Sequence, residues 1–212
     1  MQNPSHPIKA LIFDFGGVLI RTESQEPRKR LAKRLGLSPE ELYAIVFDGE
    51  ATRLAELGRI SSQERWERAA EALGLNSAEE CLAVIREFFS GDVLDTELVE
   101  RIRHWRARYK TALLSNFSDR LLDFVENELG LDDCFDAIIV SALVGVRKPN
   151  PAIYRLALDR LQVAPHEAVF IDDMRANVEG AASIGMHAIQ FTTRDALFAE
   201  LRTLLGEEPD EQ

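Results

Sequence analysis

Residue types that can carry out phosphoryl chemistry occur at four places in this sequence, each after an apolar run. These residues are Asp14, the pair Ser115 and Asn116, Lys148, and the pair Asp172 and Asp173. A carboxylate can attack phosphorus, a hydroxyl and an ammonium can bind phosphate oxygens, and paired carboxylates can bind Mg²⁺. Together they suit phosphoryl transfer, in which a cation offsets the repulsion between an anionic nucleophile and an anionic substrate.

Taken singly, each group also has an ordinary structural explanation. Ser115 and Asn116 suit a turn after a strand, and Asp173 suits the N-cap of a helix. A lysine before a proline, such as Lys148, is usually a solvated surface residue. Four such explanations rarely coincide at one edge of one sheet, so the common position of these groups favours a functional site.

The elements that must position these residues follow an α/β pattern. Five short apolar runs have the length of buried strands, at 8–13, 109–115, 136–141, 168–172 and 186–191. Amphipathic helical patterns lie between and beside them, at 95–107, 118–129, 151–162, 175–184 and 194–205. This alternation predicts a Rossmann-like, doubly wound parallel sheet. In such a sheet, ligands bind in the crevice at the carboxyl ends of the strands.

The segment 22–92 contains no strand candidate. Three of its helical segments begin with a serine N-cap and acidic residues in the first turn, at Ser38, Ser61 and Ser77. Glycines suited to C-caps punctuate the helices, at Gly36, Gly58 and Gly74. The sequence therefore predicts an α/β core domain at 1–20 and 93–212, interrupted by an all-helical cap domain at 21–92.

Composition limits the partners that this protein could have. A formal net charge of -11 would repel a phosphate backbone, so we expect no nucleic acid partner. The longest apolar stretch, 137–146, is half of a membrane span, so we expect no membrane partner. Cys81 and Cys134 lie far apart, which favours a reducing, cytoplasmic setting. The sequence carries no signal for an oligomeric state.

The four motifs resemble those of the haloacid dehalogenase superfamily, in its branch with a helical cap after the first motif (subfamily IA). They read FDFGGVL (13–19), LLSN (113–116), GVRKPNPAIY (145–154) and FIDDMRANVEGA (170–181). Their order, their spacing and the inserted segment all match, so the resemblance covers nearly the whole chain. It implies an Mg²⁺-dependent hydrolase that acts through an aspartyl-phosphate on a small phosphorylated metabolite.

The resemblance also implies catalytic and metal-binding roles for particular residues. Asp14 is similar to the nucleophile, which also ligates Mg²⁺. Asp172 is similar to the direct metal ligand of the fourth motif, and the Gly16 carbonyl would be a further ligand. Asp173 would act through water or by orienting Lys148.

A second group of residues would bind the substrate phosphate. The resemblance implies that Ser115 supplies a hydroxyl and that the backbones of Gly17 and Asn116 supply N–H groups. Lys148 would neutralise both the nucleophile and the phosphate. Asn177 stands where many relatives carry another acid, and its role is left open.

Gly16 departs from the pattern of most phosphatases in this superfamily, which carry there an aspartate that protonates the leaving oxygen and later activates water. Such general acid–base help is worth about 10² to 10⁴-fold in rate, most of all for strongly basic leaving groups. We therefore expect a slow enzyme, or one that favours better leaving groups such as the anomeric oxygen of sugar 1-phosphates. The DFGGV version resembles glucose-1-phosphate phosphatase-like proteins and the phosphatase-like domains of epoxide hydrolases. A Gly-Gly pair also suits a tight turn with positive φ.

Two other functions remain open at this point. A 2-haloacid dehalogenase would also lack an acid at the position of Gly16, although such relatives lack the paired carboxylates seen at Asp172 and Asp173. A binding or regulatory protein could retain the fold with weak catalysis or none. Halide release without Mg²⁺ would favour the first alternative, and binding without turnover would favour the second.

Overall fold

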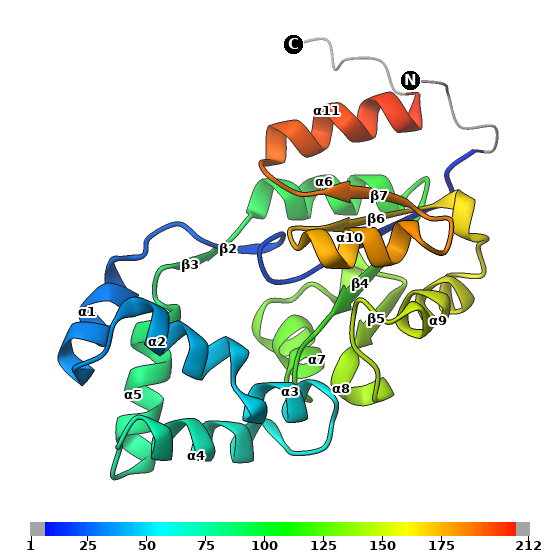
Figure 1. The fold of residues 1–212 in the computed structure, drawn as a ribbon. Helices are drawn as coiled ribbons and strands as arrows, with labels where there is room; N and C mark the ends of the chain where they lie inside the picture. The colour runs from blue at the N-terminus through cyan, green and yellow to red at the C-terminus, as the bar shows by residue number, and fades with distance from the viewer. Residues whose placement is uncertain (1–6, 207–212) are drawn as a thin grey trace.

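The central sheet of the computed structural model, which describes residues 7–206, has five parallel strands in the order β5-β4-β1-β6-β7 (Figure 1). Their bounds are β1 (Ala10–Phe13), β4 (Lys110–Ser115), β5 (Ala137–Val140), β6 (Ala168–Asp172) and β7 (His187–Gln190). Each strand lies inside one of the five predicted runs. The central strand, β1, pairs with β4 and β6, and all four of its residues are fully buried. Burial on both faces explains why this run is apolar throughout.

Helices cover both faces of the sheet (Figure 1). They are α6 (Thr96–Arg106), α7 (Leu121–Asp123) with a π-helical continuation (Phe124–Glu128), α8 (Ser141–Val144), α9 (Pro151–Leu161), α10 (Arg175–Ala182) and α11 (Arg194–Leu205), with 3₁₀ turns at Asp132–Cys134 and Pro165–Glu167. Leu11 and Phe13 pack with α6 and α11, whereas Ala10 and Ile12 pack with α9 and α10. The predicted doubly wound α/β fold is therefore confirmed. None of the helices in residues 7–206 has the length and apolar character needed to cross a membrane.

One predicted helix begins later than its sequence pattern suggests. The amphipathic pattern over 118–129 predicts a start near Ser118, but α7 begins at Leu121. The Phe117 N–H donates to Ser141 Oγ at 3.0 Å, and the Ser141 hydroxyl donates to the Phe117 carbonyl at 3.2 Å. Because both backbone groups of Phe117 are bound to one side chain, the chain after β4 runs as a loop before the helix can start.

The inserted segment folds as helices around a small core of its own, at the lower left of Figure 1. Its elements are α1 (Glu26–Leu35), α2 (Pro39–Tyr43), a π-helical segment (Ala44–Asp48), α3 (Glu50–Glu56), α4 (Ser62–Ala72) and α5 (Ala78–Phe89). The predicted serine N-caps are confirmed, because each hydroxyl accepts the N–H of the residue three positions later at 3.1 Å. The three predicted C-cap glycines adopt positive φ angles of 66–71°.

A two-stranded antiparallel ribbon connects this helical cap to the core. Its strands are β2 (Ile20–Thr22) and β3 (Asp92–Leu94), and the Thr22 hydroxyl donates to Asp92 Oδ1 at 2.7 Å. The prediction that 22–92 holds no strand is therefore wrong at both ends. Strands of three residues are too short to show an alternating pattern, and each needs a partner that is about 70 positions away. The predicted domain boundaries fall inside this ribbon, and we keep that division as a proposal.

Candidate active site

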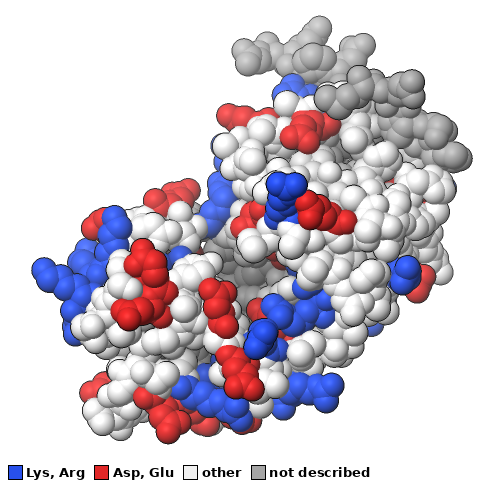
Figure 2. Space-filling model, in the orientation of Figure 1, with Lys and Arg blue, Asp and Glu red and all other residues white. Residues whose placement is uncertain are grey.

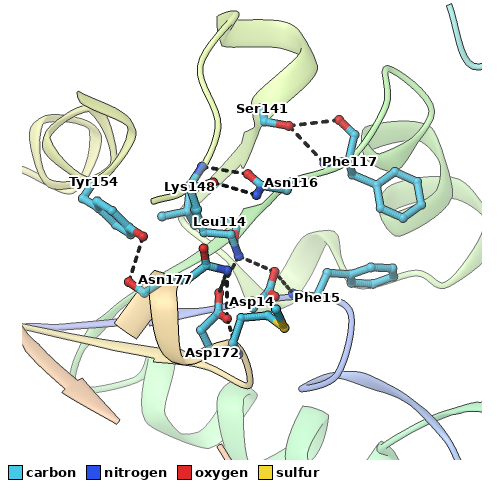
Figure 3. Close-up of polar contacts among 11 residues, drawn as sticks. Asp14, Phe15, Leu114, Asn116, Phe117, Ser141, Lys148, Tyr154, Asp172 and Asn177 are labelled. Atoms are coloured by element: carbon cyan, nitrogen blue, oxygen red, sulfur yellow. Dashed lines mark hydrogen bonds and ion pairs between the residues drawn. The ribbon is translucent and has the colours of Figure 1, made fainter. Parts of the chain in front are cut away.

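Three of the predicted site residues lie at the carboxyl ends of three neighbouring strands. Figure 3 shows two of them, Asp14 and Asp172, close together. Asp14 directly follows β1, and Asp172 is the last residue of β6. The parallel register pairs Phe13 with Ile171, and the Asp14 N–H donates to the Ile171 carbonyl at 2.9 Å. Ser115 ends β4 on the other side of β1 and is 3% exposed. The three residues therefore lie at one edge of the sheet, as the strand ends predict.

Lys148 reaches this edge from the loop that precedes α9. Its Nζ lies 2.7 Å from Asp14 Oδ1 and 2.6 Å from Asp172 Oδ2, and it donates to the Leu114 carbonyl at 2.9 Å. The side chain is 1% exposed, so this ammonium is fully withdrawn from water. Its three N–H groups are thus matched by three oxygens, which compensates for the cost of burying the charge.

The side chain of Asn116 fixes the backbone of Lys148 (Figure 3). The Lys148 N–H donates to Asn116 Oδ1 at 2.8 Å, and Asn116 Nδ2 donates to the Lys148 carbonyl at 3.0 Å. Sequence reasoning assigned only the Asn116 backbone, as a phosphate donor, and missed this pairing. The two residues are 32 positions apart, so no local pattern could reveal it. Asn116 therefore joins the second motif to the third.

Hydrogen bonds hold the buried side chain of Asp172 from several sides, which compensates for its removal from water. Its Oδ1 accepts the Met174 N–H at 2.8 Å, and Asn177 Nδ2 lies 3.0 Å and 3.1 Å from its two oxygens. The Tyr154 hydroxyl donates to the Asn177 carbonyl at 2.8 Å. Asn177, whose role the sequence left open, therefore orients Asp172 through these hydrogen bonds. The carboxylates in contact with Lys148 are Asp14 and Asp172, so of the two roles expected for Asp173 the one through water is kept as a proposal.

Of Gly16 and Gly17, only Gly17 is required by the backbone. Gly17 has a φ of +79°, and a Cβ there would overlap the Asp173 carboxylate. Gly16 is exposed, has no positive φ, and a Cβ there would meet no atom within 4 Å. The tight-turn explanation therefore applies to Gly17 and not to Gly16. At Gly16 the backbone leaves room for a side chain that this sequence does not supply.

The charges of the site are not balanced by the protein alone. Burial raises the pKa of Asp14 to about 7. Lys148 opposes this rise, and Asp172 adds to it. Burial together with Asp172 also raises the pKa of Asp173. Burial lowers the pKa of Lys148, but Asp14 and Asp172 raise it by more, so this group stays charged. Oxygen atoms of the three carboxylates lie within 4.8 Å of one another, which fits a bound divalent cation.

The side chains of two cap residues, Tyr43 and Glu56, lie close enough to the site for its charges to shift their pKa values. The pKa of Tyr43 is raised by burial, by Asp48 and by Asp173. The pKa of Glu56 is raised by burial, and Arg147, Arg65 and Lys148 counteract part of that rise. Figure 2 shows a hollow between the cap and the core, with acidic and basic side chains around it. The effects of Asp173 on Tyr43 and of Lys148 on Glu56 therefore place these two cap side chains near the site.

The raised pKa of Asp14 predicts that this carboxylate destabilises the metal-free protein above neutral pH. Its folded pKa of about 7 exceeds its ordinary value of 3.8, so its stabilising contribution is complete below pH 3.8 and is lost as the pH rises through 7. In EDTA at pH 8, Asp14→Asn should raise the melting temperature by roughly 5 °C, and at pH 5, where only part of the penalty has developed, it should raise it by less. The measurement is thermal unfolding at both pH values.

The surface variant Asp159→Asn, in α9, is the control and should shift neither transition. Addition of Mg²⁺ at pH 8 should stabilise the wild type more than Asp14→Asn, because only the wild type gains a counter-charge for an ionised Asp14. Equal melting temperatures for wild type and Asp14→Asn at pH 8 in EDTA would contradict the electrostatic description of this site.

Comparison with characterised proteins shows several phosphatases among the relatives of this chain. The sesquiterpene phosphatase astK of Aspergillus oryzae is 28% identical over 201 residues, covering 93% of this chain and 97% of that protein. The fructose-1-phosphate phosphatase YqaB of Escherichia coli is 26% identical, covering 84% of this chain and 94% of YqaB. Acyl-CoA dehydrogenase family member 10 of Mus musculus is 32% identical over 93% of this chain, which spans only 19% of that protein.

Solved structures and a family model agree with these relatives. The magnesium complex of the haloacid dehalogenase (HAD) family enzyme bt-2542 from Bacteroides thetaiotaomicron is 25% identical, with a TM-score of 0.73, covering 91% of this chain and 99% of that one. The family model of haloacid dehalogenase-like hydrolases matches residues 8–185, which include the whole cap and all four motifs. Together with the convergence of those motifs on one sheet edge, this match shows that the chain belongs to the haloacid dehalogenase-like hydrolase family.

Proposed function

We propose that this hydrolase is an Mg²⁺-dependent phosphomonoesterase that acts through an aspartyl-phosphate on a small phosphorylated metabolite. The observation that carries the proposal is the contact of one buried ammonium, Lys148, with both Asp14 and Asp172 at 2.6–2.7 Å. This arrangement keeps a carboxylate nucleophile beside a fixed positive charge, where an anionic ester could approach it. The phosphatases among its relatives support the same reaction class.

Three groups would hold Mg²⁺ in this proposal: the side chains of Asp14 and Asp172 and the carbonyl of Gly16. Asp173 belongs to the same acidic cluster and would act on the ion through water. The oxygen-only donor set and the raised pKa of Asp14 fit a hard divalent cation. When bound, the ion would neutralise charge on the nucleophile and on the phosphoryl oxygens.

In the first proposed step, an oxygen of Asp14 attacks phosphorus and forms a new P–O bond while the bond to the leaving oxygen breaks. Lys148, the Ser115 hydroxyl and the Asn116 N–H group would bind the remaining phosphoryl oxygens. The Gly17 N–H, which the resemblance assigned to the same role, donates instead to the Ile20 carbonyl at 2.8 Å. Because Gly16 offers no acid, the leaving oxygen would take its proton from water. In the second step, water attacks the same phosphorus, which releases phosphate and restores Asp14.

The absence of an acid at Gly16 leads us to propose sugar 1-phosphates as a substrate class. An anomeric oxygen leaves more readily than a primary alkoxide, so it needs less protonation in the transition state. Aldose 1-phosphates, in which the phosphate is on the anomeric oxygen, are therefore the esters to test first. The fructose-1-phosphate phosphatase among the relatives supports a sugar phosphate substrate but not this leaving group, because carbon 1 of fructose is a primary carbon.

A panel of phosphate esters with and without Mg²⁺ tests the proposed function. We expect phosphate release that requires Mg²⁺ and is faster with sugar 1-phosphates than with the matching 6-phosphates. A preference for 6-phosphates would contradict the leaving-group argument, although the phosphatase assignment would stand. Halide release from a 2-haloacid without Mg²⁺, or ligand binding with no turnover of any ester, would replace the phosphatase proposal with one of the two alternatives.

A further inference from the structure

One corner of the cap, formed by residues 56–62 between α3 and α4, contacts the core directly. Glu56 Oε2 lies 2.6 Å from Arg147 Nε, and the Ser62 N–H donates to Asp119 Oδ1 at 3.0 Å. Between them, Gly58 approaches Ala142 of α8 so closely that a Cβ on this glycine would overlap the Ala142 carbonyl. We call residues 56–62 the cap corner. Its core contacts lie on segments next to the catalytic loops.

The ion pair between Glu56 and Arg147 is the charged element of this contact. The Glu56 side chain is 16% exposed and the Arg147 side chain is 31% exposed, so both charges are partly withdrawn from water. Arg65 and Lys148 add positive charge around Glu56. A pair in this environment is less screened by solvent than an ordinary surface pair.

Arg147 immediately precedes the lysine that links the two catalytic carboxylates. The peptide groups of Lys148 are held on the core side by Asn116, at 2.8 Å and 3.0 Å. Arg147 is held on the cap side by Glu56. Asn116 of the core thus binds the backbone of Lys148, and Glu56 of the cap binds the side chain of the residue before it. A movement of the cap corner would release one of these two restraints.

We propose that Glu56 is a positioning residue for phosphate binding, which acts by holding Arg147 and thereby the backbone that carries Lys148. This inference rests on the proposed function, in which Lys148 binds the transferred phosphoryl group. The pairing makes the phosphate site complete only when the cap corner lies on the core. Glu56 itself needs no contact with the substrate, because its effect passes through the peptide bond between Arg147 and Lys148.

The test measures how tightly inorganic phosphate binds in the presence of Mg²⁺, together with kcat and KM for the best ester. Glu56→Gln should weaken phosphate binding on the order of 10-fold and lower kcat by a similar factor, because a small displacement of Lys148 misplaces its charge. Arg147→Gln should behave alike, and the double variant should be no worse than either single variant. Arg147→Lys, which keeps a positive charge opposite Glu56, should retain most of the phosphate binding.

Glu87→Gln is the matched control, because Glu87 pairs with Arg34 at the same 2.6 Å within the cap and touches no catalytic loop. It should leave phosphate binding and kcat unchanged. The inference is overturned if Glu56→Gln behaves like Glu87→Gln, or if Arg147→Lys binds phosphate as weakly as Arg147→Gln. Phosphate binding is measured without turnover. A wild type that binds phosphate but hydrolyses no ester would therefore refute the proposed phosphatase activity and leave this inference standing. A wild type that binds no phosphate would overturn both.

Discussion

Asp14→Asn should abolish hydrolysis of phosphate esters, with kcat falling on the order of 10⁴-fold or more. The amide cannot attack phosphorus, and it offers a weaker ligand for Mg²⁺ than a carboxylate does. The loss should occur without unfolding, because the variant keeps the shape of a side chain that is buried against Lys148. Steady-state phosphate release at saturating Mg²⁺ is the measurement.

A trapping experiment tests whether a covalent phosphoryl group forms on the chain. An acid-quenched reaction with a radiolabelled ester should leave label on the wild-type chain that hydroxylamine removes, as expected for an acyl phosphate. Asp14→Asn should carry no label, whereas the surface control Asp159→Asn should be labelled like the wild type. Activity or labelling that survives in Asp14→Asn would remove Asp14 as the nucleophile.

Gly16→Asp should produce a gain of activity that depends on the leaving group. A carboxylic acid at this position could protonate the departing oxygen and then activate water, which is worth about 10² to 10⁴-fold in rate for a basic alkoxide. The structure allows the change, because Gly16 has no positive φ and its added Cβ would contact no atom within 4 Å. The same change at Gly17 would meet the Asp173 carboxylate.

The measurement compares kcat for a sugar 6-phosphate, the matching sugar 1-phosphate and an aryl phosphate. We expect the largest gain with the 6-phosphate and the smallest with the aryl ester, whose leaving group needs little protonation. Gly16→Asn is the control, because it has the same size and cannot transfer a proton at neutral pH. An equal gain for Gly16→Asn, or an equal gain for all three substrates, would contradict the leaving-group argument.

The sequence by itself determined the core elements and the residue types of the site. The strand run at 168–172 needed no correction, because an apolar stretch of that length between turn residues suits only a buried strand here. The N-cap at Ser61 was equally local, since it depends on the N–H three residues later. The sequence also predicts that Asp14 and Asp172 lie close together, because parallel strands end at one edge of the sheet.

Only the tertiary structure decided which of these residues touch and how the cap meets them. The ribbon that joins the cap to the core pairs Thr22 with Asp92, and the ion pair at the cap corner joins Glu56 to Arg147. In each case the partners are 70 or more positions apart. Periodicity and capping report neighbours within a few residues, because they arise from the local geometry of the chain. Long-range pairings arise from the packing of complete elements, which fixes distances that no local pattern records.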